Sequence, residues 1–167
     1  MEQIAKISKK QLVYVDESGI HRNTTKIYGY CKKGEKLYGK VSGNRYVKRE
    51  NFISGYVNGE IVAPWCYDGS CDKEFFEYWV EKALIPVLEE GMVVIMDNAS
   101  FHKSEKVKKM IENAKCRLLF LPPYSPELNP IEKFWANLKK LVTKIAHKYK
   151  NFRDAINYAF RYYMIPN

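Results

Sequence analysis

The run Met-Val-Val-Ile-Met-Asp-Asn-Ala-Ser-Phe-His at residues 92–102 decides the fold of this chain. Its first five residues are apolar at every position, which is typical of a strand covered on both faces, because a strand with one solvated face alternates apolar and polar residues. The run stops at Asp97. In open α/β sheets the chemistry gathers at the ends of such strands. The stretch therefore predicts an α/β domain with an acid at the edge of its sheet.

A second acid follows an apolar run nearer the N-terminus. Leu12 to Val15 is apolar and leads into Asp16-Glu17-Ser18-Gly19, which indicates a buried strand meeting a turn. A turn or helix-capping role is a structural explanation for each Asp taken alone. Burying an acid beside a core strand is costly without a compensating cation or donor, however. Two such acids on neighbouring strands would repel each other. A bound divalent metal ion is the simplest way to neutralise their charges.

The remaining segments alternate between strand and helix signals. Residues 26–58 favour antiparallel strands, Asn58-Gly59 a hairpin turn, and Ile61 to Trp65 a returning strand, which Pro64 places at an edge of the sheet or which ends near Pro64. Further elements are expected in this order: a helix over 72–90 with Asp72 as N-cap and a kink at Pro86, a basic helix over 103–114, a strand over 117–121, an amphipathic helix from Ile131 to Ile145, and a last helix over about 151–163. Strands followed by alternating helix and strand predict an α/β domain with a mixed sheet.

Glu132 has a structural explanation of its own. Asn129-Pro130-Ile131-Glu132 reads as an N-cap, a proline at the first helical position and a glutamate at the third, which is a capping box. A capping glutamate near the sheet edge can also reach a metal, so the two interpretations are compatible.

Charge and composition exclude several classes of protein. The chain has 167 residues, 46% hydrophobic, enough for one packed domain. Its net charge of +9 lies entirely in residues 99–167, which hold 14 basic and 5 acidic residues, and this favours a polyanionic partner. No apolar stretch approaches the roughly 20 residues of a membrane helix, and the N-terminus lacks the apolar core of a secretory signal. The four cysteines form no CxxC pair, so we expect reduced thiols in a cytoplasmic, nucleoid-associated protein without a membrane partner.

Two motifs carry a resemblance to a known family. Asp-Asn-Ala-Ser-Phe-His at 97–102, followed by Leu-Pro-Pro-Tyr-Ser-Pro-Glu-Leu-Asn-Pro-Ile-Glu at 121–132, resembles the catalytic core of DDE transposases, in the mariner-like superfamily and its bacterial insertion-sequence branch. The 34 residues between Asp97 and Glu132 are similar to that family's spacing. Residues 13–19 resemble its first-acid strand, and Tyr28-Gly29-Tyr30 with Lys33-Gly34 resembles the next one.

The resemblance runs from about residue 11 to residue 145 and implies a fold and a site. The implied fold is α/β and ribonuclease H-like, with a five-stranded mixed sheet flanked by helices. Asp16 would lie on the first strand, Asp97 just after the fourth and Glu132 on a late helix. These three acids are the expected catalytic residues and metal ligands, and their carboxylates should converge. Glu17 is excluded from the triad because strand alternation sends its side chain to the other face.

The resemblance also implies a reaction. Three carboxylates suit two Mg²⁺ or Mn²⁺ ions, and such a pair can activate the attacking oxygen and stabilise the leaving oxygen of a phosphodiester. Water would nick double-stranded DNA at the transposon end, and the 3′-hydroxyl would then attack target DNA.

Supporting roles are predicted for residues near the triad. His102 would contact a phosphate or a metal-bound water, or else serve as a cap or surface residue. Asn98 would bond the scissile phosphate or hold the turn, and Tyr124 and Ser125 would touch DNA unless the loop is simply stiff. The lysines expected to track phosphates, unless they are only solvated faces, include Lys103, Lys133, Lys139 and Lys140.

We expect residues 1–167 to form a single catalytic domain. The family's N-terminal helix-turn-helix modules have no room before Asp16, so an isolated catalytic domain, the second frame of a split gene or a truncated remnant is expected. The alternative function is an inactive or regulatory fragment that binds DNA or a partner transposase chain, and a homodimer is a further possibility. Another ribonuclease H-like nuclease, such as a resolvase, is a third interpretation that the motif pair disfavours.

Overall fold

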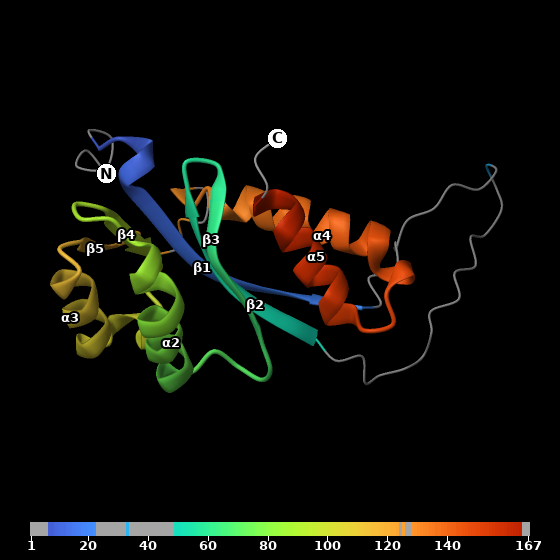
Figure 1. Ribbon diagram of the computed structural model, residues 1–167, viewed down its shortest axis with the longest axis horizontal. Coiled ribbons are helices and arrows are strands. Elements are labelled where there is room, and N and C mark those ends of the chain that lie inside the picture. The colour runs from blue at the N-terminus through green and yellow to red at the C-terminus, as the bar shows by residue number, and fades with distance from the viewer. Residues whose placement is uncertain (1–6, 23–32, 34–48, 124, 126–127, 165–167) are drawn as a thin grey trace.

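The protein contains a five-stranded mixed sheet (Figure 1). The computed structural model describes residues 7–22, 33, 49–123, 125 and 128–164. The strands are β1 (Leu12–His21), β2 (Arg49–Val57), β3 (Glu60–Tyr67), β4 (Val93–Met96) and β5 (Arg117–Phe120), in the order β3-β2-β1-β4-β5. β1 and β4 pair in parallel, as do β4 and β5, whereas β2 is antiparallel to both of its neighbours. The predicted five-stranded mixed sheet is confirmed.

The hairpin between β2 and β3 turns at Asn58 and Gly59, as predicted. Both residues have positive φ, 48° and 102°, which is the conformation that a two-residue hairpin turn requires. β3 is an edge strand, so Pro64 costs the sheet little. The strands and family-like residues expected between residues 26 and 48 lie almost entirely outside the described residues.

The helices are α2 (Lys73–Trp79), α3 (Glu105–Asn113), α4 (Ile131–Ile145) and α5 (Phe152–Met164), with short helical turns η1 (Lys9–Gln11), η2 (Val80–Leu84), η3 (Ile85–Val87), η4 (Ser100–Lys103) and η6 (Ala146–Lys148). Asp72 caps α2 by accepting a hydrogen bond from the Phe75 amide. The predicted helix over 72–90 is confirmed in part: the chain is helical from Lys73 to Val87 and changes at Pro86, but it is not a single α-helix. Pro86 has no N–H for the carbonyl four residues earlier, and after Trp79 the chain continues as a π-helical turn and then a 3₁₀ turn.

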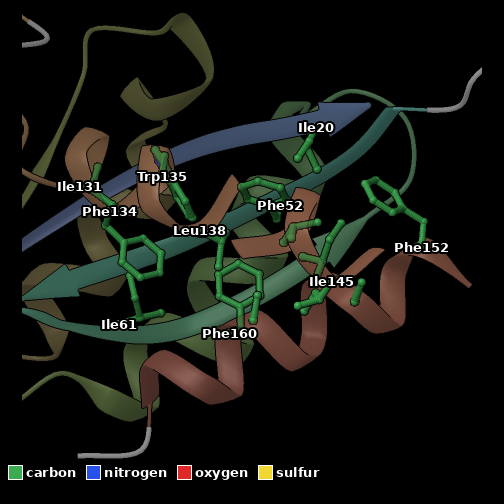
Figure 2. Close-up of a cluster of buried hydrophobic side chains, with 14 residues drawn as sticks. Ile20, Phe52, Ile61, Ile131, Phe134, Trp135, Leu138, Ile145, Phe152 and Phe160 are labelled. Carbon is green, nitrogen blue, oxygen red and sulfur yellow. The ribbon is translucent and has the colours of Figure 1, made fainter. Parts of the chain in front are cut away.

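The helices cover the two faces of the sheet (Figure 1). α4 and α5 pack on one face, around Phe52, Trp135 and Leu138 (Figure 2). α2, η2 and α3 pack on the other face, where Val94 and Met96 of β4 are buried. Val93 and Ile95 are buried on the opposite side, so β4 is covered on both faces, as its sequence predicts. No helix in the described part of the chain is long and apolar enough to cross a membrane.

β1 does not end in the predicted turn. Residues 16–19 continue as strand because β2 supplies hydrogen-bonding partners as far as His21. β4 is shorter, and its pairing with β1 is limited to Leu12, Val13 and Tyr14. Extending that register by two residues sets Asp16 level with Asp97. The early end of β4 therefore opens the sheet beside Asp16, and this gap positions the site.

Candidate active site

The three predicted acids line one cleft at the point where β4 ends. Asp16 comes from β1, Asp97 directly follows β4, and Glu132 lies in the first turn of α4. The cleft has a volume of about 470 Å³, and Asn98, Asn129 and Ser125 also line it. Residues 116 positions apart in the chain are thus brought together by the sheet and by the helix packed on it.

Asp16 is largely buried beneath α4. Its Oδ2 accepts a hydrogen bond of 3.0 Å from Trp135 Nε1, the indole of the same helix that carries Glu132. The pKa of Asp16 is raised from 3.8 to about 7, first by burial and then by the carboxylates of Glu17 and Glu132, while the indole hydrogen bond opposes the shift. Asp16 therefore faces negative charge that the surrounding side chains do not neutralise.

Asp97 has the opposite environment. Its Oδ1 accepts hydrogen bonds from His102 Nδ1 at 2.6 Å and from the Ala99 amide at 2.9 Å. The hydrogen bond from His102 holds the pKa of Asp97 below its usual value, and burial only partly offsets it. The side chain is 54% exposed, so an ionised carboxylate is presented at the mouth of the cleft.

The predicted capping box at the start of α4 is not formed. Asn129 Oδ1 has no hydrogen-bond partner among the described residues, although Asn129 is only 7% exposed. The Glu132 amide bonds instead to the backbone carbonyl of Asn129, at 3.2 Å. The chain turns through Pro130, and the backbone carbonyl of Asn129 accepts the Glu132 amide hydrogen bond that the Asn129 side chain was expected to accept. A capping box therefore does not explain Glu132 in this structure. The Oδ1 atom of Asn129 is buried beside the cleft without a hydrogen-bond partner among the described residues.

His102 is completely buried rather than available to DNA. Its Nε2 lies 2.9 Å from Glu17 Oε1 and its Nδ1 2.6 Å from Asp97 Oδ1, so both ring nitrogens are occupied. Burial alone would lower the pKa of His102, but the hydrogen bonds and charges of these two carboxylates raise it from 6.5 to about 9. A fully buried ring contradicts the surface interpretation, and in this geometry neither ring nitrogen is left for a phosphate or a metal-bound water. The imidazolium instead links two acids.

The other supporting residues fall into three groups. Asn98 holds the turn, because its Nδ2 donates to the Leu121 carbonyl, while Ser125 bonds locally to the Pro123 carbonyl. Tyr124 lies outside the described residues. The lysines Lys103, Lys133 and Lys140 are exposed. Lys139 is half-buried, and its pKa is lowered by burial and by Arg49, while Glu132 and Asp16 oppose this shift. Lys139 therefore lies near two of the three acids.

The donor set fits a hard divalent cation. Its donors are the carboxylate oxygens of the three acids, together with the unpartnered carbonyl oxygen of Asn129, and these are ligand types that Mg²⁺ and Mn²⁺ accept. Within residues 7–22, 49–123 and 128–164, however, no three His, Cys, Asp or Glu side chains already form a metal-binding group. The acids share one cleft without a preassembled cluster.

Three residues of this region are not assigned to the site by the sequence. Periodicity marks Trp135 only as an apolar position of its helix, although it follows Glu132 by three residues and so lies on the same side. Asn129 has the pattern of a cap. Glu17 is expected on the opposite face of β1, which the structure bears out, yet it reaches Asp97 through His102. The sequence carries no signal for that bridge, because it depends on how the segment after β4 folds.

Comparisons with known proteins bear on the family and the fold of this chain. Residues 11–156 match the family model described as DDE superfamily endonuclease. An uncharacterised 39 kDa protein of insertion element IS630 from Shigella sonnei is 35% identical over 134 residues, which are 78% of this chain and 38% of that protein. The chain thus spans well under half of that relative.

Solved structures show the same fold at low sequence identity. The Mos1 strand transfer complex has a TM-score of 0.74 at 15% identity, over 99% of this chain and 51% of the Mos1 chain. The catalytic core domain of BIV integrase has a TM-score of 0.59 at 11% identity, over 90% of this chain and 81% of that domain. The fold is ribonuclease H-like, as expected. With the family model matching most of its length and an insertion-element protein among its relatives, the chain belongs to the DDE superfamily endonuclease family.

Proposed function

We propose that this chain is the catalytic domain of a metal-dependent DNA transposase, with Asp16, Asp97 and Glu132 as its catalytic residues and metal ligands. In this proposal it cleaves phosphodiesters at transposon ends and joins 3′-hydroxyl ends to target DNA. The observation that supports it is the single cleft lined by acids from β1, from the segment after β4 and from α4.

The acids have distinct tasks in this proposal. Asp97 enters ionised at the open mouth of the cleft, whereas Asp16 sits deeper with one oxygen fixed by Trp135. Two Mg²⁺ or Mn²⁺ ions, when bound, supply activation of the attacking oxygen and charge stabilisation at the leaving oxygen. Asn129 Oδ1 is placed to bind a cation or one of its waters, since it is buried without a partner among the described residues.

The DNA backbone is proposed to continue from the cleft along α4. A groove of about 840 Å³ runs beside this helix and is lined by Arg49, Lys139, Lys140 and Lys144. Glu132 begins the helix and these lysines follow on its later turns. In this proposal the phosphates lie along these basic side chains while the scissile bond stays near the acids.

An inactive or regulatory fragment is the second candidate. The observation that supports it is the basic groove beside α4, lined by Arg49, Lys139, Lys140 and Lys144, which can hold DNA without any reaction at the acids. Such a fragment would bind DNA or a partner transposase chain, which includes a second copy of itself, and would cleave nothing.

A nicking assay separates the two candidates. Supercoiled plasmid is incubated with wild type, Asp97→Asn and Glu132→Gln in Mg²⁺, in Mn²⁺ and in EDTA. Because both substitutions remove an anionic donor without changing size, each is expected to lower nicking by at least about a hundredfold, while retention on a DNA column stays nearly unchanged. The matched control is Glu89→Gln, an exposed glutamate of the loop before β4, which should nick like wild type.

Two results would overturn the assignment. Equal nicking by wild type and Asp97→Asn would reject the catalytic role of the acids. Absence of nicking by wild type in both Mg²⁺ and Mn²⁺ would favour the regulatory fragment.

A further inference from the structure

We propose that Glu17, His102 and Asp97 form a positioning chain, in which Glu17 acts through the buried imidazole to hold Asp97 in the orientation that the cleft requires. This inference rests on the proposed function. It assigns Glu17 and His102 as positioning residues, neither of them a metal ligand nor a DNA contact.

The geometry of the positioning chain fixes one oxygen of Asp97. Oδ1 accepts from His102 Nδ1 at 2.6 Å and from the Ala99 amide at 2.9 Å. Oδ2 makes no hydrogen bond to any residue that the structure describes. Ligating carboxylates are commonly oriented by hydrogen bonds to their other oxygen. The arrangement thus leaves Oδ2 for the cleft.

The imidazole is itself held from every side. Its Nε2 bonds to Glu17 Oε1 at 2.9 Å, and the rings of Phe76 and Phe101 lie 4.5 and 4.4 Å from the imidazole, centroid to centroid. The ring is 0% exposed and cannot rotate without disrupting this packing. Glu17, whose side chain is 16% exposed, sets the orientation of the ring from β1.

The positioning chain gives the two consecutive acids of β1 different tasks. Strand alternation directs Asp16 to the α4 face, where it bonds Trp135, and Glu17 to the α2 and α3 face, where it bonds His102. Asp97 follows the end of β4, where it bonds to His102 and also lines the cleft with Asp16. β1 therefore contributes one carboxylate to the cleft directly and orients a second one indirectly.

Substitutions of His102 should have different effects if the residue only fills the core than if it positions Asp97. The amide nitrogen of Asn can take the place of Nδ1 and that of Gln the place of Nε2. His102→Asn therefore keeps a donor for Asp97, whereas His102→Gln keeps a donor for Glu17 and abandons Asp97. If His102 only fills the core, both substitutions should cost similar stability and leave the metal affinity unchanged.

The experiment measures Mn²⁺ affinity of the DNA-free protein by calorimetry, together with plasmid nicking and thermal unfolding. His102→Gln is expected to weaken Mn²⁺ binding by about tenfold or more and His102→Asn by only a few fold, since loss of an orienting partner costs roughly 10–100-fold. Glu17→Gln should fall between wild type and His102→Gln, and it keeps the histidine in place if the other variants fold poorly. His147→Gln, at an exposed histidine, is the matched control and should bind Mn²⁺ like wild type.

Crystal structures of the same variants give a readout independent of metal. Asp97 should keep its side-chain rotamer in His102→Asn and leave it in His102→Gln. Equal Mn²⁺ affinities and an unmoved Asp97 across the variants would overturn the positioning chain even if wild type nicks DNA. A wild type that nicks nothing would overturn the proposed function, and the order of affinities and rotamers would still judge the positioning chain.

Discussion

Trp135 Nε1 lies 3.0 Å from Asp16 Oδ2, so the core indole of α4 donates a hydrogen bond to the acid of β1. The ring also packs at 5.1 Å from Phe52, centroid to centroid, within the main hydrophobic cluster (Figure 2). One side chain thus packs in the core and also bonds to an acid that lines the cleft. The position of α4, and with it of Glu132, is tied to that of Asp16.

Trp135 should report cation binding through its fluorescence. Because its indole bonds directly to Asp16, Mn²⁺ in the cleft is expected to change tryptophan emission in wild type. In Trp135→Phe the change should be largely abolished, because Trp135 is the tryptophan that bonds to Asp16, whereas the Trp79 indole donates to the Ala63 carbonyl. Titration of both proteins with MnCl₂ is the measurement, and an equal response from the two would contradict the placement of the cation beside Asp16.

Stability should depend on pH through Asp16. The pKa of Asp16 is about 7 in the folded protein and 3.8 for an aspartate free of such surroundings, so between these values the folded state binds more protons than the unfolded state. The free energy of unfolding therefore falls as pH rises through this window. The shift of about three units corresponds to at most about 4 kcal/mol.

Asp16→Asn should remove that penalty. Its amide oxygen can still accept the Trp135 hydrogen bond, so at pH 4 the variant is expected to be close to wild type. At pH 8 in EDTA it should be more stable by roughly 2–4 kcal/mol. Urea unfolding at both pH values tests this, and a stability difference that does not change with pH would rule it out.

Asn129→Ala separates a cap from a cleft residue. If the Asn side chain capped α4, the substitution would cost about 1 kcal/mol of unfolding free energy. Because Asn129 Oδ1 has no partner among the described residues, we expect a cost below about 0.5 kcal/mol, together with weaker Mn²⁺ binding. Chemical denaturation and calorimetry measure the two effects. A full capping cost with unchanged Mn²⁺ affinity would restore the capping role.

The lysines of the α4 groove should control the salt dependence of DNA binding. DNA binding weakens as salt rises, so the slope of log K against log salt is negative. Removing one lysine–phosphate interaction is expected to make this slope shallower by about 0.9. Lys139→Gln and Lys140→Gln should each reduce the slope by up to this amount, measured by fluorescence anisotropy on duplex DNA across a series of KCl concentrations. The control is Lys82→Gln, whose lysine is paired with Glu81 in η2. Equal slopes for all four proteins would place the DNA elsewhere.

Much of the fold follows from local patterns. The unbroken apolar run at 92–96 predicts a doubly covered strand, and its residues do divide between the two faces. Asn58-Gly59 predicts a tight hairpin, because few other residues tolerate positive φ at both positions. The end of β1 is not predicted correctly, since Asp16 to Gly19 have turn-forming chemistry and only pairing with β2 keeps them extended.

Sequence alone was enough to establish the family, the types of most elements and the three candidate acids, because apolar periodicity and two specific motifs depend on neighbouring residues. The surroundings of each acid depend on tertiary structure. The early end of β4 opens the gap at Asp16, α4 brings Trp135 to it, and the turn after β4 buries His102 between Glu17 and Asp97. Hydrogen bonds and desolvation between residues up to 119 positions apart set the charges of the cleft, and no local pattern encodes those distances.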